Sequence, residues 1–131
     1  QKWTLFPYTT LFRSLLEVHE ATKHIEAPVY IGLMPLTSSR NAEFLHNEVP
    51  GIKISQEILN IMAKFNNEPL QSKKEGIAIT KGLIEAAAEL FNGIYLITPF
   101  MNYEMSVELS SHANEYSSRL MRRKQNVNLV N

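Results

Sequence analysis

Cysteine is absent from this sequence of 131 residues, which excludes disulfides, catalytic thiolates and Cys-ligated metal sites. A chain without cysteine suits a reducing compartment, so we expect a cytoplasmic protein. No apolar run reaches the roughly 18 residues that a membrane-spanning helix needs, and we therefore expect no membrane partner. The four histidines show no metal-ligand spacing, so no metal site is assigned.

The sequence also lacks a net charge. Its 13 Lys and Arg residues balance 13 Asp and Glu residues, which gives no general attraction to nucleic acid. Hydrophobic residues make up 44% and charged residues 20% of the chain, a composition typical of a single folded domain. No dinucleotide-binding glycine motif, P-loop or nucleophile elbow occurs, so these features define no activity.

The first fourteen residues, QKWTLFPYTTLFRS, have no clean helical or strand period. The part from Thr4 to Ser14 resembles the translation of a sequencing-library adapter over eleven contiguous residues. We therefore treat residues 1–14 as an adapter-like segment, leave them out of the fold prediction and expect native sequence from Leu15. The alternative is a β-rich edge segment, because the residues from Tyr8 to Phe12 favour strands.

Two short apolar runs predict buried strands of the kind found in parallel sheets, 29–34 (VYIGLM) and 94–98 (IYLIT). A proline, Pro35 or Pro99, follows each run and ends the strand. Apolar periodicity and capping signals predict helices around them. The first helix covers 15–26, and the second follows the hydroxyls of 37–39 and ends at about His46. Ser55 caps the third helix, and the fourth runs from the capping box Ser72/Glu75 to a C-cap at Gly93. The last helix covers 102–114.

The order helix, strand, helices, strand, helix predicts an α/β fold with two parallel strands joined by a right-handed helical crossover. Two strands make too small a sheet to form a core of their own, and the chain offers too few partners to cover both of its faces. We therefore expect residues 15–116 to be a piece of a larger α/β protein. A polar, basic tail (117–131) follows, which we predict to be frayed or weakly helical.

Polar residues follow both predicted strands. Sites in α/β sheets and barrels form at the carboxyl ends of strands, which selects residues 34–41 and 98–103. Both segments combine apolar residues with uncharged donors and acceptors, which suits a flat heteroaromatic ligand. Thr37 to Arg40 either hold a phosphate at a helix N-terminus or only cap the helix, and capping is the commoner role. Asn41 either grips a ligand or is solvated in the first turn.

Two stretches resemble the methylenetetrahydrofolate reductase family. Residues 28–54 (PVYIGLMPLTSSRNAEFLHNEVPGIKI) resemble the seventh strand and following helix of these enzymes, and residues 93–109 (GIYLITPFMNYEMSVEL) resemble the eighth strand and last helix. The phrases NEVPG and YEM lie at the right separation, and the two stretches cover about a third of the chain. The form fused to a homocysteine methyltransferase domain is the most similar.

The resemblance implies that residues 15–116 are the C-terminal third of a (β/α)8 TIM barrel, its last two strands with their helices; a complete barrel takes about 250 residues. The family reduces 5,10-methylenetetrahydrofolate to 5-methyltetrahydrofolate in one-carbon metabolism and methionine biosynthesis. NAD(P)H gives a hydride to FAD, and the reduced flavin passes it to the folate. The catalytic acid and the main FAD contacts lie on earlier strands. The resemblance therefore gives this chain no catalytic residue and implies that the chain alone is inactive, whereas the parent is a homo-oligomer.

The resemblance places substrate-binding residues after both strands. Asn41 takes the position of an amide, often Gln, that contacts folate or nicotinamide. Leu45 takes the position, one helical turn further on, of an apolar residue that stacks near the ligand. This residue is aromatic in some members of the family. Phe100 and Met101 would line the barrel mouth. Asn102 stands where the family often has a basic residue, so a charge contact to the substrate is in doubt.

Two alternatives remain. One is another barrel enzyme with a phosphate site after strands seven and eight, which would use Thr37 to Arg40. The other is a small helical interaction module that binds an acidic partner through Arg119, Arg122, Arg123 and Lys124. A solvated tail is the commoner role for such a cluster.

Overall fold

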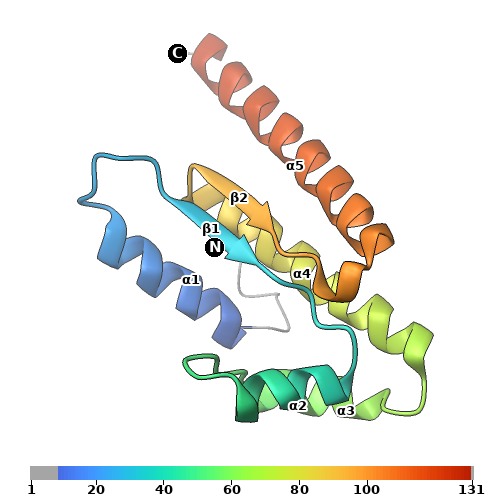
Figure 1. The fold of residues 1–131 in the computed structure, drawn as a ribbon. Coiled ribbons are helices and arrows are strands. Elements are labelled where there is room, and N and C mark those ends of the chain that lie inside the picture. Colours follow the sequence, from blue (N-terminus) through green and yellow to red (C-terminus); the bar gives the residue numbers. More distant parts are fainter. Residues whose placement is uncertain (1–8, 131) are drawn as a thin grey trace.

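The computed structural model describes residues 9–130 and has the predicted order of elements (Figure 1). No helix in this part of the chain is both long and apolar enough to cross a membrane. The elements are helix α1 (Thr9–Thr22), strand β1 (Tyr30–Leu33), helices α2 (Ser39–Glu48), α3 (Gln56–Lys64) and α4 (Pro69–Leu90), strand β2 (Gly93–Leu96), the 3-10 turn η2 (Pro99–Met101) and helix α5 (Tyr103–Val130).

Strands β1 and β2 pair in parallel, as the α/β pattern predicted, with Tyr30 opposite Gly93 and Leu33 opposite Leu96. Asn92 fixes the start of the pair, because its N–H donates to the Val29 carbonyl at 3.0 Å and its side-chain Oδ1 accepts from the Val29 N–H at 2.8 Å. Since the strands are parallel, their carboxyl ends lie at the same edge of the sheet.

One face of the sheet carries the core. Ile31 and Leu33 of β1 and Ile94 and Leu96 of β2 point to this face, and helices α1, α4 and α5 all supply side chains against it. Figure 1 shows α4 running behind both strands. A second core cluster joins α4 to α2 and α3, and its fully enclosed residues are Ala42, Ile58, Met62 and Ile79.

The other face of the sheet is open in the described part of the chain. Tyr30 is 62% and Tyr95 55% exposed there. Each tyrosine ring lies over the glycine of the opposite strand, since a methyl group on Gly32 would overlap the Tyr95 ring and one on Gly93 would lie 3.0 Å from the Tyr30 ring. The sheet therefore has one packed face and one face presented to solvent.

Helices α4 and α5 run parallel, and three side-chain contacts between them keep one sequence offset. Lys81 Nζ donates to Glu108 Oε1 at 2.8 Å, and Glu85 Oε1 contacts His112 Nε2 at 3.1 Å. One turn further on, the Tyr116 hydroxyl donates to the Glu89 carboxylate. Each pair is 27 residues apart, so the contacts form a ladder along the outer surface of both helices.

The predicted boundaries of α4 were wrong at both ends. The helix begins at Pro69 rather than at the Ser72/Glu75 capping box, because proline needs no N–H partner in a first turn. The Ser72 hydroxyl instead donates to the Phe65 carbonyl at 2.9 Å. At the other end Gly93 is the first residue of β2 and has no positive φ, so it is not a left-handed cap.

The ends of the chain also differ from the prediction. Helix α1 begins at Thr9, inside the adapter-like segment, and Phe12 packs with Leu15 against α4. Residues 9–12 are therefore helical and not the alternative edge strand, whereas Tyr8 lies outside the described residues. Helix α1 ends at Thr22, before Glu26. Helix α5 continues to Val130, so the basic tail, predicted to be frayed or weakly helical, is helical. Figure 1 shows this end extending away from the other elements.

Gly76 sets how closely α4 approaches the chain after β1. A methyl group on Gly76 would overlap the backbone carbonyl oxygen of Leu36. In a helix interior, alanine is more favourable than glycine by roughly 0.5–1 kcal/mol. Helix propensity and packing therefore predict opposite effects of Gly76→Ala on stability.

We expect Gly76→Ala to lower the free energy of unfolding by about 2 kcal/mol, because the helix must move away from Leu36. Urea denaturation followed by circular dichroism measures the change. Ala78→Gly on the exposed side of α4 is the control, and it should cost about 1 kcal/mol through propensity alone. A Gly76→Ala variant that is more stable than the parent chain would contradict the close approach.

Tyr116 should make stability fall at alkaline pH. Burial, the hydrogen bond to Glu89 and the nearby carboxylates raise the pKa of Tyr116 to about 12, whereas an unfolded tyrosine has a pKa of about 10. Below pH 10 both states keep the proton and the contact is fully present. Between these two values only the unfolded state loses its proton, so unfolding becomes easier as the pH rises. Urea unfolding at pH 9, 10 and 11 gives the free energies of unfolding of the parent chain and of Tyr116→Phe, and the difference between the two should shrink as the pH rises. A constant difference would refute the raised pKa of Tyr116.

Candidate functional site

The candidate site lies at the edge of the sheet where both strands end. After β1 the chain turns through Pro35 into α2, and after β2 it turns through Pro99 into α5. Because β1 and β2 are parallel neighbours, these two connections lie side by side, as the sequence predicted.

The start of α2 is held by a reciprocal pair of hydrogen bonds. Ser38 is the N-cap, and its Oγ accepts from the Asn41 N–H at 3.1 Å. The Asn41 Oδ1 accepts from the Thr37 N–H at 3.2 Å. The predicted capping role of this segment is therefore confirmed.

This pairing decides what Asn41 can offer a ligand. Its Oδ1 is engaged by Thr37, which leaves the amide nitrogen Nδ2 as the group able to reach outward. The side chain is half-buried. Asn41 is thus both a part of the cap and a donor at the edge of the site.

The connection after β2 has unusual backbone geometry. Phe100 has φ 50° and ψ 37°, and Met101 has φ 53°, so two successive residues with Cβ atoms adopt the left-handed region. The turn is held by the Asn102 N–H, which donates to the Pro99 carbonyl at 3.0 Å. The hydroxyls of Thr98 and Ser106 meet at 2.7 Å and tie the strand end to α5. Strained backbone of this kind often accompanies ligand sites.

A depression of about 280 Å³ lies between the two connections. Its walls come from the start of α2 and from η2, and the residues that line it are Thr37, Ser38, Arg40, Asn41, Phe44 and Phe100. It therefore combines two aromatic rings with an amide, hydroxyls and a guanidinium.

The structure brings together only some of the predicted site residues. Asn41 and Phe100 share the depression. Leu45 is buried, with 9% of its surface exposed, and lines a separate pocket. Met101 is exposed and Asn102 is half-buried, and neither lines the depression.

Phe44 lines the depression but was missed by the sequence analysis. A usable signal was present, because Phe44 lies three and four residues after Asn41 and Arg40 on α2 and hence shares their helix face. An exposed phenylalanine on the face of a predicted site residue is a candidate for ligand contact.

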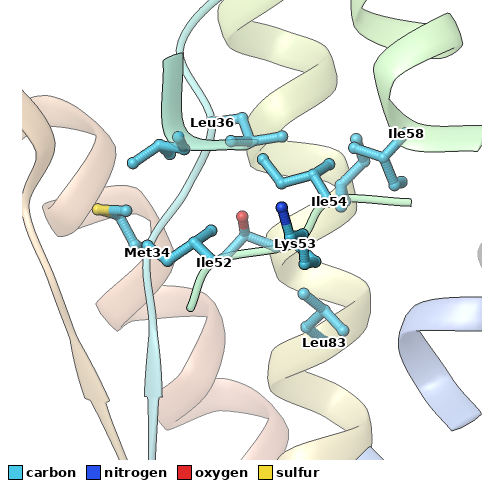
Figure 2. A pocket seen from close by; sticks show the side chains of 10 residues that line it. Met34, Leu36, Ile52, Lys53, Ile54, Ile58 and Leu83 are labelled. Carbon is cyan, nitrogen blue, oxygen red and sulfur yellow. The ribbon is translucent and has the colours of Figure 1, made fainter. Parts of the chain in front are cut away.

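The second pocket, of about 150 Å³, is lined mainly by aliphatic side chains from the segment after β1, the 52–54 loop and helices α2, α3 and α4 (Figure 2). Figure 2 shows Lys53 among the side chains of Ile52, Ile54 and Leu83. The loop is fixed to α2 because the Ile54 N–H donates to His46 Nδ1 at 3.0 Å. The Thr80 hydroxyl is already used, since it donates to the Gly76 carbonyl at 2.8 Å. This pocket has the character of an imperfectly filled core.

Within residues 9–130, no three His, Asp or Glu side chains gather as metal ligands would. Comparisons with protein-family models, curated proteins and solved structures give no match for the chain.

We expect Asn41→Ala to lower the free energy of unfolding by about 1 kcal/mol, because the Thr37 N–H loses its partner. Asn41→Asp keeps the acceptor and adds a negative charge in the first turn of α2, so it should leave stability close to that of the parent chain. Urea unfolding at pH 7 compares the two variants. Equal losses for both would show that the cap does not depend on Oδ1.

Proposed function

We propose that this chain is the C-terminal third of a (β/α)8 barrel of the methylenetetrahydrofolate reductase type, whose parent reduces 5,10-methylenetetrahydrofolate with NAD(P)H and FAD. The observation that carries the proposal is the shared depression of Asn41 and Phe100. These residues come from the two separate stretches that resemble the family, and both follow parallel strands at the edge where barrels build their sites.

The layering of the chain supports a barrel segment. In a (β/α)8 barrel each strand turns one face to the outer helices and the other to the barrel interior. Here α1, α4 and α5 all pack on the face of Ile31 and Leu33, while Tyr30 and Tyr95 remain open on the other. The parallel α4 and α5, joined by their ladder, fit neighbouring helices of such an outer ring.

The chain's own contribution would be to hold and orient the folate. Asn41 Nδ2 would donate to a polar edge of the ligand, and Phe100 would cover part of an aromatic ring. Met101 would lie at the barrel mouth, and the buried Leu45 would hold α2 in place by packing in the core. Asn102 provides no positive charge toward a folate carboxylate.

FAD, when bound, supplies the hydride that reduces the methylene group. In the family, the flavin is held by strands that come earlier in the barrel than the two strands of this chain. We therefore assign no residue of this chain to flavin binding. Residues 15–116 would instead close the barrel wall and position the folate against the flavin.

A phosphate site after the same strands is less well supported. The Thr37 N–H already donates to Asn41 Oδ1 and the Asn41 N–H to Ser38 Oγ, so two of the N–H groups that could bind a phosphate are occupied within the α2 cap.

A chimera tests the proposal. Residues 15–116 would replace the last third of the barrel in a methylenetetrahydrofolate reductase, and we expect the purified chimera to carry FAD and to reduce methylenetetrahydrofolate with NAD(P)H. Asn41→Ala in the chimera should lower kcat/KM roughly tenfold, the value of one lost hydrogen bond. Ser110→Ala, on an exposed position of α5, should leave it unchanged.

The unfused chain serves as the second arm of this experiment, and it should purify without stoichiometric flavin. A chimera that holds FAD and passes electrons to an artificial acceptor, yet leaves methylenetetrahydrofolate unreduced, would refute the folate assignment. Stoichiometric flavin on the unfused chain would contradict the assignment of the flavin to earlier strands.

A further inference from the structure

The second pocket, the space of about 150 Å³ among α2, α3, α4 and the 52–54 loop, shares no lining residue with the depression. Its lining is mainly aliphatic and includes the buried side chains of Ile58 and Ile79. Lys53 also lines the pocket and is exposed, so the pocket reaches the surface beside this residue (Figure 2). An imperfectly filled core that opens to solvent can accept an apolar guest, as engineered aliphatic cavities of about 150 Å³ accept benzene.

The lining of this pocket is poorly suited to hold water. A buried water molecule needs at least about two polar partners, and Thr80 is the only polar side chain besides Lys53 that the described residues contribute to the lining. The Thr80 hydroxyl already donates to the Gly76 carbonyl at 2.8 Å, so it can offer a water molecule only an acceptor. An apolar group that enters the pocket would therefore displace only weakly held water, which favours binding.

The 52–54 loop is fixed by hydrogen bonds to residues outside the pocket. The Ile52 N–H donates to the Val49 carbonyl at 3.2 Å, and the Ile54 N–H donates to His46 Nδ1 at 3.0 Å. The next residue, Ser55, is the N-cap of α3. This wall of the pocket is therefore formed before any ligand arrives, which lowers the entropic cost of binding.

Lys53 places a positive charge at the edge of this apolar space. The salt bridges of residues 9–130 involve Lys23, Lys81 and His112, and Lys53 takes part in none of them. A lysine can lay its apolar stem along aliphatic neighbours while its ammonium group stays in water. Sites for small molecules are typically apolar with a few polar groups that fix the orientation of the ligand. The pocket therefore suits a ligand with one compact apolar group and one negative charge.

We propose that this pocket binds a small monocarboxylate, whose apolar group of about six carbon atoms fills the space and whose carboxylate pairs with Lys53 Nζ. Branched and carbocyclic acids fit the volume, whereas a long fatty acyl chain exceeds it. The inference does not rest on the proposed function, because the pocket is formed by described residues of this chain and shares none of them with the depression.

Thermal unfolding of the full chain, followed by circular dichroism, tests the site, because a ligand that binds only the folded state raises Tm. The compounds are cyclohexanecarboxylate, the neutral cyclohexylmethanol and the cationic cyclohexylmethylamine, all at one ionic strength. Acetate, which carries the charge without the ring, gives the baseline. We expect cyclohexanecarboxylate to raise Tm above this baseline, the alcohol to bind about two- to fivefold more weakly, and the amine to bind more weakly still. The larger adamantanecarboxylate should leave Tm at the baseline.

Three variants locate the binding. Lys53→Met keeps an apolar stem but removes the charge, so cyclohexanecarboxylate should lose its advantage over the alcohol. Lys74→Met, at an exposed position of α4 outside the lining, is the matched control and should bind both compounds as the parent chain does. Ile52→Phe adds a ring at the pocket wall, so it should fold without a loss in Tm and show at most about a fifth of the rise with cyclohexanecarboxylate.

The outcomes are separate from those of the barrel chimera. A rise in Tm with cyclohexanecarboxylate no larger than that with acetate would overturn the site. An equal rise in the parent chain and in Ile52→Phe would place the binding elsewhere and would overturn it as well. If the alcohol binds the parent chain as tightly as the carboxylate does, or if Lys53→Met binds the carboxylate as tightly as the parent chain, the monocarboxylate class is refuted. A chimera that fails to reduce methylenetetrahydrofolate would alter none of these results.

Discussion

The position of α4 against the end of β1 governs the arrangement of the rest of the chain. Gly76 lets the helix backbone come so close to the Leu36 carbonyl that a methyl group would not fit between them. This contact fixes the direction in which the chain leaves β1, and hence where Ser38 begins α2. Further along α4, Ala86 and Ala87 pack against α1, and the side chains of Lys81, Glu85 and Glu89 contact α5. A shift of this one helix would therefore move one wall of the depression and the core together.

Much of the fold could be predicted from the sequence because the signals were local. Short apolar runs bounded by proline predicted both strands, and hydroxyls before periodic segments predicted the caps at Ser38 and Ser55. The errors arose where a local signal had a competing use. Ser72 fits a capping box, yet Phe65 offers it a carbonyl and Pro69 can open the helix four residues after Phe65. Gly93 fits a helix cap, yet it pairs with Tyr30 as the first residue of β2.

The site could be predicted only in part. The rule that sites form at strand ends located both connections correctly, since it depends on strand direction alone. The rule could not tell that Phe100 lines the depression and its neighbour Met101 does not. The directions of these two side chains depend on two positive φ angles, which no sequence pattern predicted. The burial of Leu45 depends on α3 and α4 folding over α2, which is a property of the tertiary structure.

The regular offset between α4 and α5 constrains how the intervening segment can change in length. Three contacts share one spacing and fix the position of α5 along α4, so an added or deleted residue between Glu89 and Glu108 has to be absorbed without moving either helix. The paired strand β2 has no slack to absorb such an indel. Length variation would therefore be confined to the turn around Phe100, which joins β2 to α5 and takes part in neither the contacts between the two helices nor the strand pairing.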